Sequence, residues 1–193
     1  MRIVGGKWRG RPIEAPEGRS VTRPTTDRIR ESMASMVLSA FDLDLSDVSV
    51  LDAFAGSGAI GLELLSRGAA HATFVDRDRG AVARIRRNVA SLGASDQSAV
   101  VAGDALAIAS RGSLAGAPFS LVVLDPPYAM EALRVRELVE TLAGEGLLAR
   151  DAVILYERDS KSSDLEVPGF ASVREKSHGT TCVELLRREA AHE

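Results

Sequence analysis

The motif with the clearest chemical meaning in this chain is Asp125-Pro126-Pro127-Tyr128. It directly follows the apolar run 121–124, which predicts a strand, and open parallel sheets bind their ligands at the carboxyl ends of their strands. Two consecutive prolines keep the chain extended, so we expect the Pro126 carbonyl to lie beside the Asp125 carboxylate without a partner in the sheet. Together these two groups could accept both hydrogens of an exocyclic NH2 group, while Tyr128 stacks on the attached base. We therefore predict a catalytic role for these four residues in chemistry on an aromatic amine.

An exocyclic amine on an aromatic ring is a poor nucleophile because its lone pair is delocalised into the ring. Two acceptors that hold both of its hydrogens favour a pyramidal nitrogen, whose lone pair can then be aimed at a methyl group. The motif therefore indicates methyl transfer to a base amine. The alternative is a proline-rich strand exit with a partly buried tyrosine.

A glycine-rich turn follows the strand predicted over 48–53. Gly56, Gly58 and Gly61 form a GxGxxG pattern between this strand and the next helix, and Asp76 lies 20 residues after Gly56, at the end of the following strand. Such glycines let the backbone approach a ligand closely, and a carboxylate after the second strand can accept hydrogen bonds from both ribose hydroxyls of an adenosine. The pattern alone is compatible with NAD. We expect an adenosine cofactor to be bound by the following residues of this region: Asp52, Phe54, Ala55, Gly56, Ser57, Gly58, Asp76, Arg77, Asp104 and Ala105.

Asp52, beside the turn, favours S-adenosylmethionine (SAM) over NAD. A dinucleotide would place its pyrophosphate at the helix N-terminus, where a nearby carboxylate is unfavourable. SAM instead brings a sulfonium and an ammonium group, which a carboxylate attracts. The alternative is that Asp52 only orders its own turn. Asp104 is placed to receive the adenine amino group, and the alternative for this residue is a capping role at the start of the next helix.

The hydrophobic pattern around these motifs predicts an α/β fold. Apolar runs alternate with stretches of helical periodicity, which is typical of a parallel sheet covered on both faces. The last two strands are joined through His178-Gly179 and form an antiparallel hairpin at one edge. We expect strands at 48–53, 72–75, 98–102, 121–124, 152–156, 171–176 and 181–187, and helices at 27–39, 59–67, 79–92, from 105 and at 130–142. The result is a mostly parallel seven-stranded sheet of Rossmann-like type.

The charged residues are distributed unevenly along the chain. Its 193 residues include 24 Lys plus Arg and 27 Asp plus Glu, for a net charge of -3 at pH 7. Residues 1–30 alone hold eight basic and three acidic side chains, a net charge of +5, and the remainder carries -8. We expect 1–24 to form a small basic arm, built as a β-hairpin, ahead of a catalytic domain over 25–193. Cations beside an aromatic ring predict RNA binding, and the alternative is a solvated charged arm; the residues expected to bind RNA are Lys7, Trp8, Arg9 and Arg11.

Two groups of residues resemble known enzymes. The 52–58 turn together with the 125–128 motif resembles the SAM-dependent methyltransferases that modify exocyclic amines of bases. Segments 2–11 and 23–31 are similar to the RsmD family, the bacterial 16S rRNA (guanine(966)-N(2))-methyltransferases. The resemblance implies a Rossmann-like class I methyltransferase fold, SAM as methyl donor and 16S rRNA as substrate, within the small ribosomal subunit or an assembly intermediate. It also implies that Thr25 and Arg28 contact the methionine end of SAM.

Three other functions are compatible with parts of the sequence. A DNA adenine-N6 or cytosine-N4 methyltransferase would need an insertion that recognises its target, and the connections in this chain are short. An NAD-dependent oxidoreductase would leave Asp52 and the two prolines of the 125–128 motif unexplained. A non-catalytic RNA-binding protein of the same fold would not need the intact motifs.

The remaining features argue against other kinds of site and location. Cys182 is the only cysteine, and we expect it to be a core residue of the C-terminal hairpin. His71, His178 and His192 have no ligand-like spacing, so we expect no metal. The chain shows neither a secretory leader nor an apolar stretch of membrane-spanning length, and we expect a cytoplasmic protein that acts as a monomer without binding a membrane.

Overall fold

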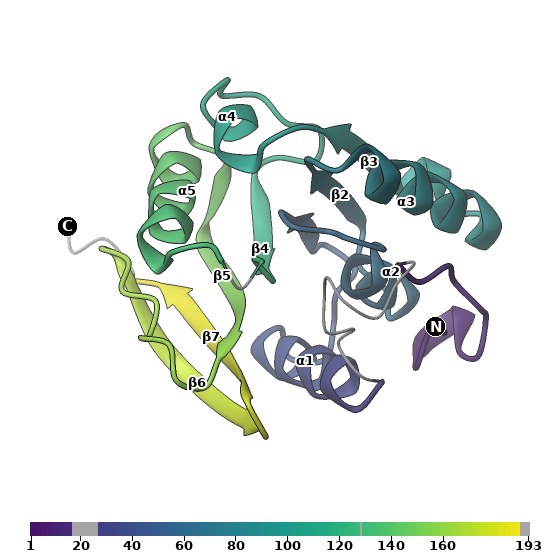
Figure 1. Ribbon diagram of the computed structural model, residues 1–193, viewed down its shortest axis with the longest axis horizontal. Helices are drawn as coiled ribbons and strands as arrows, with labels where there is room; N and C mark the ends of the chain where they lie inside the picture. The colour runs from purple at the N-terminus through teal and green to yellow at the C-terminus, as the bar shows by residue number, and fades with distance from the viewer. Residues whose placement is uncertain (17–26, 128, 190–193) are drawn as a thin grey trace.

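The structure is a computed structural model, and its described residues are 1–16, 27–127 and 129–189 (Figure 1). The strands are β1 (Ser49–Asp52), β2 (His71–Asp76), β3 (Ser98–Ala102), β4 (Phe119–Leu124), β5 (Leu148–Asp159), β6 (Phe170–His178) and β7 (Thr181–Arg188). The helices are α1 (Asp27–Ala40), α2 (Ala59–Ser66), α3 (Arg79–Leu92), α4 (Ala105–Ala109) and α5 (Ala132–Gly144), with short 3-10 helices η1 (Gly6–Trp8) and η2 (Ser95–Gln97). Two predicted site residues, Thr25 and Tyr128, lie outside the described residues.

The strands form one sheet in the order β3-β2-β1-β4-β5-β7-β6. The pairs from β3 through to β5 are parallel, and β7 pairs antiparallel with both β5 and β6. This topology confirms the predicted mostly parallel seven-stranded sheet with an antiparallel C-terminal hairpin. The strand order reverses beside β1, since β2 and β3 lie to one side of it and β4 and β5 to the other. Open α/β sheets bind their ligands outside the carboxyl ends of the strands at such a point.

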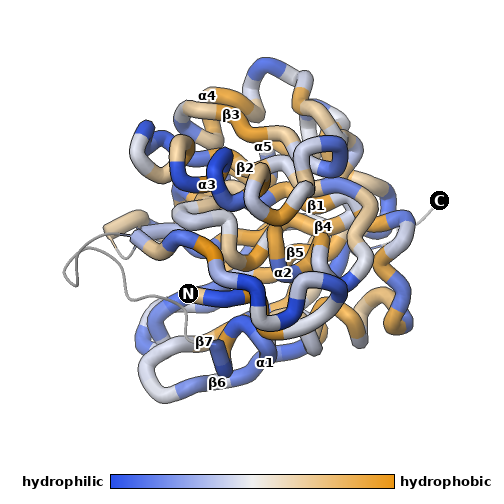
Figure 2. The backbone as a smooth tube through the Cα atoms, turned by 90° about the vertical axis from the view of Figure 1, so that its right-hand side faces the viewer, coloured by the Kyte–Doolittle hydropathy of each residue, from blue (hydrophilic) through white to orange (hydrophobic). Residues whose placement is uncertain are grey.

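Helices cover both faces of the sheet (Figure 1). One hydrophobic cluster packs α1, α2 and α3 against a face that includes Val123 and Leu155, and a second cluster packs α4 and α5 against the other face, which includes Val122 and Ile154. The four consecutive side chains 121–124 of β4 are all fully buried because they alternate between two covered faces. Figure 2 shows the same arrangement as apolar central strands within a more polar periphery. No helix within the described ranges is long and apolar enough to cross a membrane.

Several elements differ from the prediction by one or two residues at their ends, and β5 differs by more. β5 extends well beyond the predicted 152–156, because it pairs with β4 from Leu148 and with β7 as far as Asp159. Backbone pairing continues there through polar residues that a hydrophobic pattern does not detect. The helix predicted at 130–142 begins only at Ala132, because the Met130 N–H donates to the Pro127 carbonyl (2.8 Å) in a turn that precedes the helix.

The N-terminal segment folds back on itself and packs beside α2 and α3. An antiparallel bridge joins Arg2 and Pro12, and the Gly10 N–H donates to the Ile3 carbonyl at 2.9 Å. Ile3 and Ile13 are buried in the cluster on the α1–α3 face. The arm is therefore attached to the body through its apolar side chains. The predicted boundary between residues 24 and 25 lies outside the described residues.

Candidate active site

The turn between β1 and α2 uses its glycines for different reasons. Gly56 and Gly58 adopt left-handed backbone conformations, with φ of +57° and +76°, which other residues rarely adopt. At Gly61, within α2, an added Cβ would lie 2.4 Å from the ring of Phe74, so α2 can pack closely on β2. A Cβ at Gly56 would meet no atom within 4 Å. The backbone at Gly56 is therefore open to a ligand.

Asp52 ends β1 and is buried beneath this turn. Its Oδ2 accepts a hydrogen bond from the Gly61 N–H at 3.2 Å, so the carboxyl does order the turn, as one of the two sequence interpretations expected. Burial raises the pKa of Asp52 to about 7; the Gly61 hydrogen bond opposes this shift, and the charges of Asp125 and Asp76 increase it. Acidic side chains from the ends of β1 and β2 and from the turn after β4 therefore meet at one edge of the sheet, where a cation would relieve their repulsion.

Asp76 ends β2 and holds the glycine turn from the other side. Its Oδ2 accepts from the Gly56 N–H at 2.8 Å, and its Oδ1 accepts from the Asp78 N–H at 2.9 Å. A carboxylate can accept about four hydrogen bonds, so this geometry is compatible with additional bonds from ribose hydroxyls. Arg77 is exposed beside Asp76. Ribose binding by Asp76 stays a prediction that the structure allows.

The other predicted cofactor residues lie around the same edge. Asp104 is exposed and caps α4, because its Oδ1 accepts the Ala107 N–H at 3.0 Å. This capping role is the alternative that the sequence left open. Ala105 begins α4, and Phe54 packs against the hydrophobic cluster on the α4–α5 face. The Ala55 N–H donates to the backbone of β2 at 3.0 Å, which fixes the start of the glycine turn.

Asn88 is a buried polar residue that the sequence analysis did not select. Its Nδ2 donates to the Ser57 carbonyl of the glycine turn at 2.9 Å and to the Glu14 carbonyl at 3.1 Å. Its Oδ1 accepts the Glu14 N–H at 2.7 Å. Asn88 therefore joins the end of the arm to the turn. A signal was present in the sequence, because Asn88 is the polar member of the otherwise apolar buried face of α3.

The turn after β4 presents its acid at the same edge. Asp125 and Pro126 are partly buried, and Pro127 is exposed. The charge of Asp125 contributes to the raised pKa of Asp52, so the proline turn after β4 lies close to the carboxyl under the glycine turn. The structure thus brings together the predicted catalytic acid and the predicted cofactor turn.

Arg28, predicted to contact the methionine end of SAM, is exposed in the first turn of α1. Burial lowers the pKa of His178 in the β6–β7 turn, and the charges of Lys176 and Arg28 lower it further. The His178 ring bonds to the Ser32 hydroxyl of α1 at 2.9 Å. The structure therefore places Arg28 within electrostatic reach of the hairpin turn, and its contact with SAM stays a prediction.

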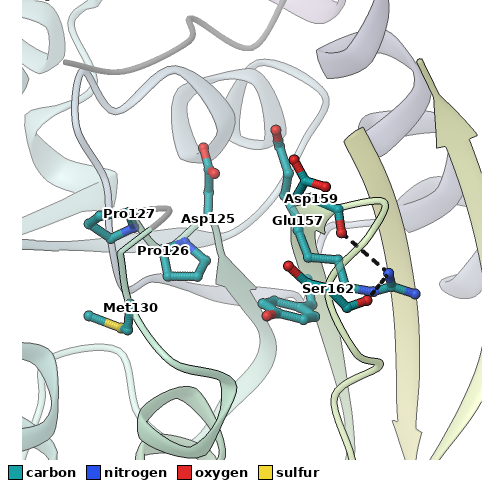
Figure 3. A pocket seen from close by; sticks show the side chains of 9 residues that line it. Asp125, Pro126, Pro127, Met130, Glu157, Asp159 and Ser162 are labelled. Atoms are coloured by element: carbon teal, nitrogen blue, oxygen red, sulfur yellow. Dashed lines mark hydrogen bonds between the residues drawn. The ribbon is translucent and has the colours of Figure 1, made fainter. Parts of the chain in front are cut away.

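A pocket opens where the carboxyl ends of β4 and β5 meet (Figure 3). Its lining residues are Asp125, Pro126, Pro127 and Met130 after β4, and Tyr156, Glu157, Arg158, Asp159 and Ser162 from the end of β5 and the turn that follows. In Figure 3 the side chains of Asp125, Glu157 and Asp159 rise on the same side of the pocket. The β5 residues were not selected from the sequence because they follow a strand without forming a recognisable motif.

Arg158 fixes the wall of this pocket. Its guanidinium is buried, donates to the Ser162 carbonyl at 2.8 Å and to Glu175 at 3.0 Å, and bonds to the Asp164 carboxylate. These contacts hold the connection between β5 and β6 against the sheet. The pocket is therefore bounded on one side by the proline turn after β4 and on the other by a connection that the buried guanidinium of Arg158 holds in place.

The residues predicted to bind RNA divide into two groups. Lys7, Arg9 and Arg11 are exposed, whereas Trp8 is only 8% exposed and belongs to the hydrophobic cluster. Lys7 covers the indole ring, with its Nζ 4.5 Å from the ring centre. Burial of the ring argues against the base stacking that we predicted for Trp8. Its indole anchors the arm instead, and three cations stay at the surface.

The sheet order, the glycine turn after β1 and the Asp-Pro-Pro turn after β4 define the fold of the SAM-dependent methyltransferases. The solved structure of yhhF from Escherichia coli, a protein assigned as a methyltransferase, superposes with a TM-score of 0.81 at 37% identity, over 98% of each chain. The magnesium protoporphyrin IX methyltransferase of Synechocystis, solved with bound SAM, matches 83% of this chain and 79% of its own with a TM-score of 0.62; at 18% identity this match concerns the fold alone.

The family model described as Conserved hypothetical protein 95 matches residues 1–187, and the chain belongs to this family. Ribosomal RNA small subunit methyltransferase D of Escherichia coli K12 is 37% identical over 194 residues, which cover 100% of this chain and 92% of the relative. The resemblance to the RsmD family found in the sequence is therefore confirmed.

Proposed function

We propose that this protein transfers a methyl group from SAM to the exocyclic N2 of a guanine in the 16S rRNA of the small ribosomal subunit, at position 966 by family resemblance. The observation that carries the proposal is the placement of Asp125, at the carboxyl end of β4, within electrostatic reach of Asp52 under the glycine turn. One region thereby combines acceptors for a base amine with a turn suited to adenosine. The name of the Escherichia coli relative supports rRNA of the small subunit as the substrate class.

The residues at the turn fit SAM. Open space around Gly56 permits close approach of a ligand, Asp76 is held against the turn, and Asp52 provides buried negative charge. When bound, SAM supplies an electrophilic methyl group on a sulfonium. A cation near Asp52 would lower the pKa of that carboxyl from about 7 and keep it ionised at neutral pH.

Asp125 and Pro126 act on the base. The carboxylate and the carbonyl accept the two N2 hydrogens, which localises the nitrogen lone pair and directs it toward the methyl group. The nitrogen–carbon bond forms as the carbon–sulfur bond breaks, the sulfur retains the electron pair, and the surplus N2 proton then leaves to solvent. Position and orientation supply most of the acceleration. No covalent intermediate is needed, and Cys182 is a buried residue of β7.

The RNA must deliver an unstacked base to the pocket, because N2 is otherwise covered by neighbouring bases. The exposed cations Lys7, Arg9 and Arg11 suit phosphate contacts. α3, to which the arm is joined through Asn88, adds further positive charge, since its sequence has four arginines and no acidic residue. The basic region is therefore formed by the arm together with α3.

Substitution of Asp125 tests the site directly. Asp125→Ala should lower the turnover of methyl transfer by roughly 100-fold or more, because a preorganised acceptor for the reacting amine is lost. SAM affinity, measured by calorimetry, should change far less than turnover, since the glycine turn and Asp76 are intact. Glu140→Ala, at an exposed site on α5, is the matched control. Turnover of Asp125→Ala near that of the control would contradict the proposal.

A further inference from the structure

Glu157 occupies the position beside Asp125 at the carboxyl edge of the sheet. β4 and β5 run parallel with Leu124 opposite Tyr156, so Asp125 and Glu157 take the next position on each strand. Neighbouring strands lie about 4.8 Å apart. The backbone positions of Asp125 and Glu157 are therefore adjacent.

Their side chains also point to the same side of the sheet. Val123 and Leu155, two residues earlier on each strand, pack in the same hydrophobic cluster, and strand residues two apart share a face. Asp125 and Glu157 both line the pocket, and Figure 3 shows them rising on one side of it. A base whose amine is held by Asp125 would consequently bring the neighbouring atom of its ring edge toward Glu157.

Glu157 is 8% exposed. A carboxylate offers only acceptors, and its hydrogen bonds strengthen where water is excluded. The side chain of the next residue, Arg158, points to the other face of the sheet, where it bonds to Glu175 and to the connection after β5. The side of the pocket above Asp125 is therefore acidic, and it favours a ligand edge made of adjacent N–H donors.

Guanine presents such an edge, because its N1–H lies next to its N2 amine. Adenine and cytosine also carry exocyclic amines, but the adjacent ring nitrogen in each of them is an acceptor that a carboxylate would repel. We propose that Glu157 accepts the N1–H of the target guanine and so selects guanine over the other amino-bearing bases. This inference rests on the proposed function, and it adds a specificity-determining residue to that site.

The first test uses the unaltered protein and two acceptors. 16S rRNA is prepared by ligation with either guanosine or 2-aminopurine ribonucleoside at the methylated position, either as naked RNA or within small subunits, whichever the protein methylates. 2-Aminopurine keeps the amine and lacks the N1–H. We expect kcat/KM to be roughly 10- to 100-fold lower for 2-aminopurine, as for the loss of a hydrogen bond to a charged group. Equal kcat/KM for the two acceptors would overturn the inference.

The second test is Glu157→Gln, whose amide can donate to the bare N1 of 2-aminopurine. We expect methylation of guanosine to fall by roughly 10- to 100-fold and the preference for guanosine over 2-aminopurine to fall by at least tenfold. Asp151→Asn, which removes one exposed negative charge at the other end of β5, should keep the wild-type preference. SAM affinity and thermal unfolding of each variant show whether the fold is intact.

The possible outcomes distinguish failure of this inference from failure of the proposed function. An unchanged preference in a folded Glu157→Gln, together with guanosine methylation by the wild type, would reject the role of Glu157 alone. Failure of the wild type to methylate guanosine in any small-subunit RNA would reject the proposed function and this inference together.

Discussion

At the scale of single residues, Asp52 determines how the site responds to pH. Its carboxyl is buried under the glycine turn with a pKa of about 7, against an ordinary value of 3.8. The acid is consequently divided between its neutral and ionised forms near physiological pH. Binding of a cation and folding of the chain act on this equilibrium in opposite directions, and each gives a separate prediction.

We expect SAM affinity to increase between pH 6 and pH 8. The ionised form of Asp52 attracts a cation, and at pH 6 only about one molecule in ten carries that form when the pKa is 7. The dissociation constant should therefore fall roughly tenfold over this range in calorimetric titrations. The SAM amino group also titrates, and the Asp52→Asn variant separates the two effects. This variant should bind SAM more weakly, and its pH profile should lack the contribution of Asp52. Identical pH profiles for both proteins would contradict the account.

The same carboxyl should make the protein less stable as pH rises from about 4 to about 7. The folded protein retains the Asp52 proton over this range while the unfolded chain releases it, so the contribution of Asp52 to stability is lost as pH approaches the folded pKa. The loss should be on the order of a few kcal/mol in the free energy of unfolding. Urea unfolding at pH 4.5 and pH 8 measures it, and Asp52→Asn should lack this part of the pH dependence. Equal slopes in both proteins would show that the pKa is not raised.

The residues found from sequence were those that adjoin a motif. Asp52 ends an apolar strand and Asp125 follows one, beside glycines or prolines, and the structure places the two residues in one region, as the pattern predicted. Glu157 was not found, because its importance comes from the register between β4 and β5, which no local pattern encodes. Trp8 was assigned to RNA because an aromatic beside cations has the same sequence pattern whether its ring is open or packed in the core.

At the scale of elements, a buried carboxylate attaches the arm to α2. The oxygens of Glu63 accept the Val4 N–H at 2.8 Å, the Gly5 N–H at 2.7 Å and the Arg67 Nε–H at 2.9 Å. Glu63 is 1% exposed. Charged acceptors with several donors form strong hydrogen bonds, so this residue fixes where the arm leaves the body.

Glu63→Gln should loosen the arm, because an amide has one acceptor oxygen and no charge. We expect the free energy of unfolding to fall by about 1.5–3 kcal/mol, and the Val4 and Gly5 amides should exchange faster in hydrogen-exchange measurements. Glu31→Gln removes the exposed ion pair with Arg67 and should cost less than about 1 kcal/mol. Unchanged protection of Val4 and Gly5 in Glu63→Gln would refute this attachment.

The sheet was predictable because β1, β2 and β4 are apolar on both faces and alternate with helical segments. The extent of β5 was not, because its ends are polar and depend on pairing with β4 and β7. The packing of the arm could not be predicted from local sequence patterns either, since it depends on side chains of α2 and α3 that lie more than 50 residues away in the sequence.

At the scale of the whole molecule, charge is separated between a basic arm and an acidic body. Neutralising Lys7, Arg9 and Arg11 together to Gln should weaken rRNA binding and reduce the slope of log affinity against log salt by about 2 to 3, because each phosphate contact contributes roughly 0.7 to 0.9. The same charge change at Arg134, Arg136 and Arg150, on α5 and β5, should leave the slope nearly unchanged. Equal effects of the two triple variants would mean that the arm does not bind RNA.

The central claim is methylation of guanine N2 in small-subunit rRNA, and one measurement tests it most directly. The protein is incubated with SAM tritiated on its methyl group and with 16S rRNA, assembled small subunits, plasmid DNA or no acceptor, and the labelled nucleosides are then identified. We predict label only with 16S rRNA or small subunits, and only as N2-methylguanosine. Label in adenine or cytosine of DNA, or no transfer to any acceptor, would contradict the account.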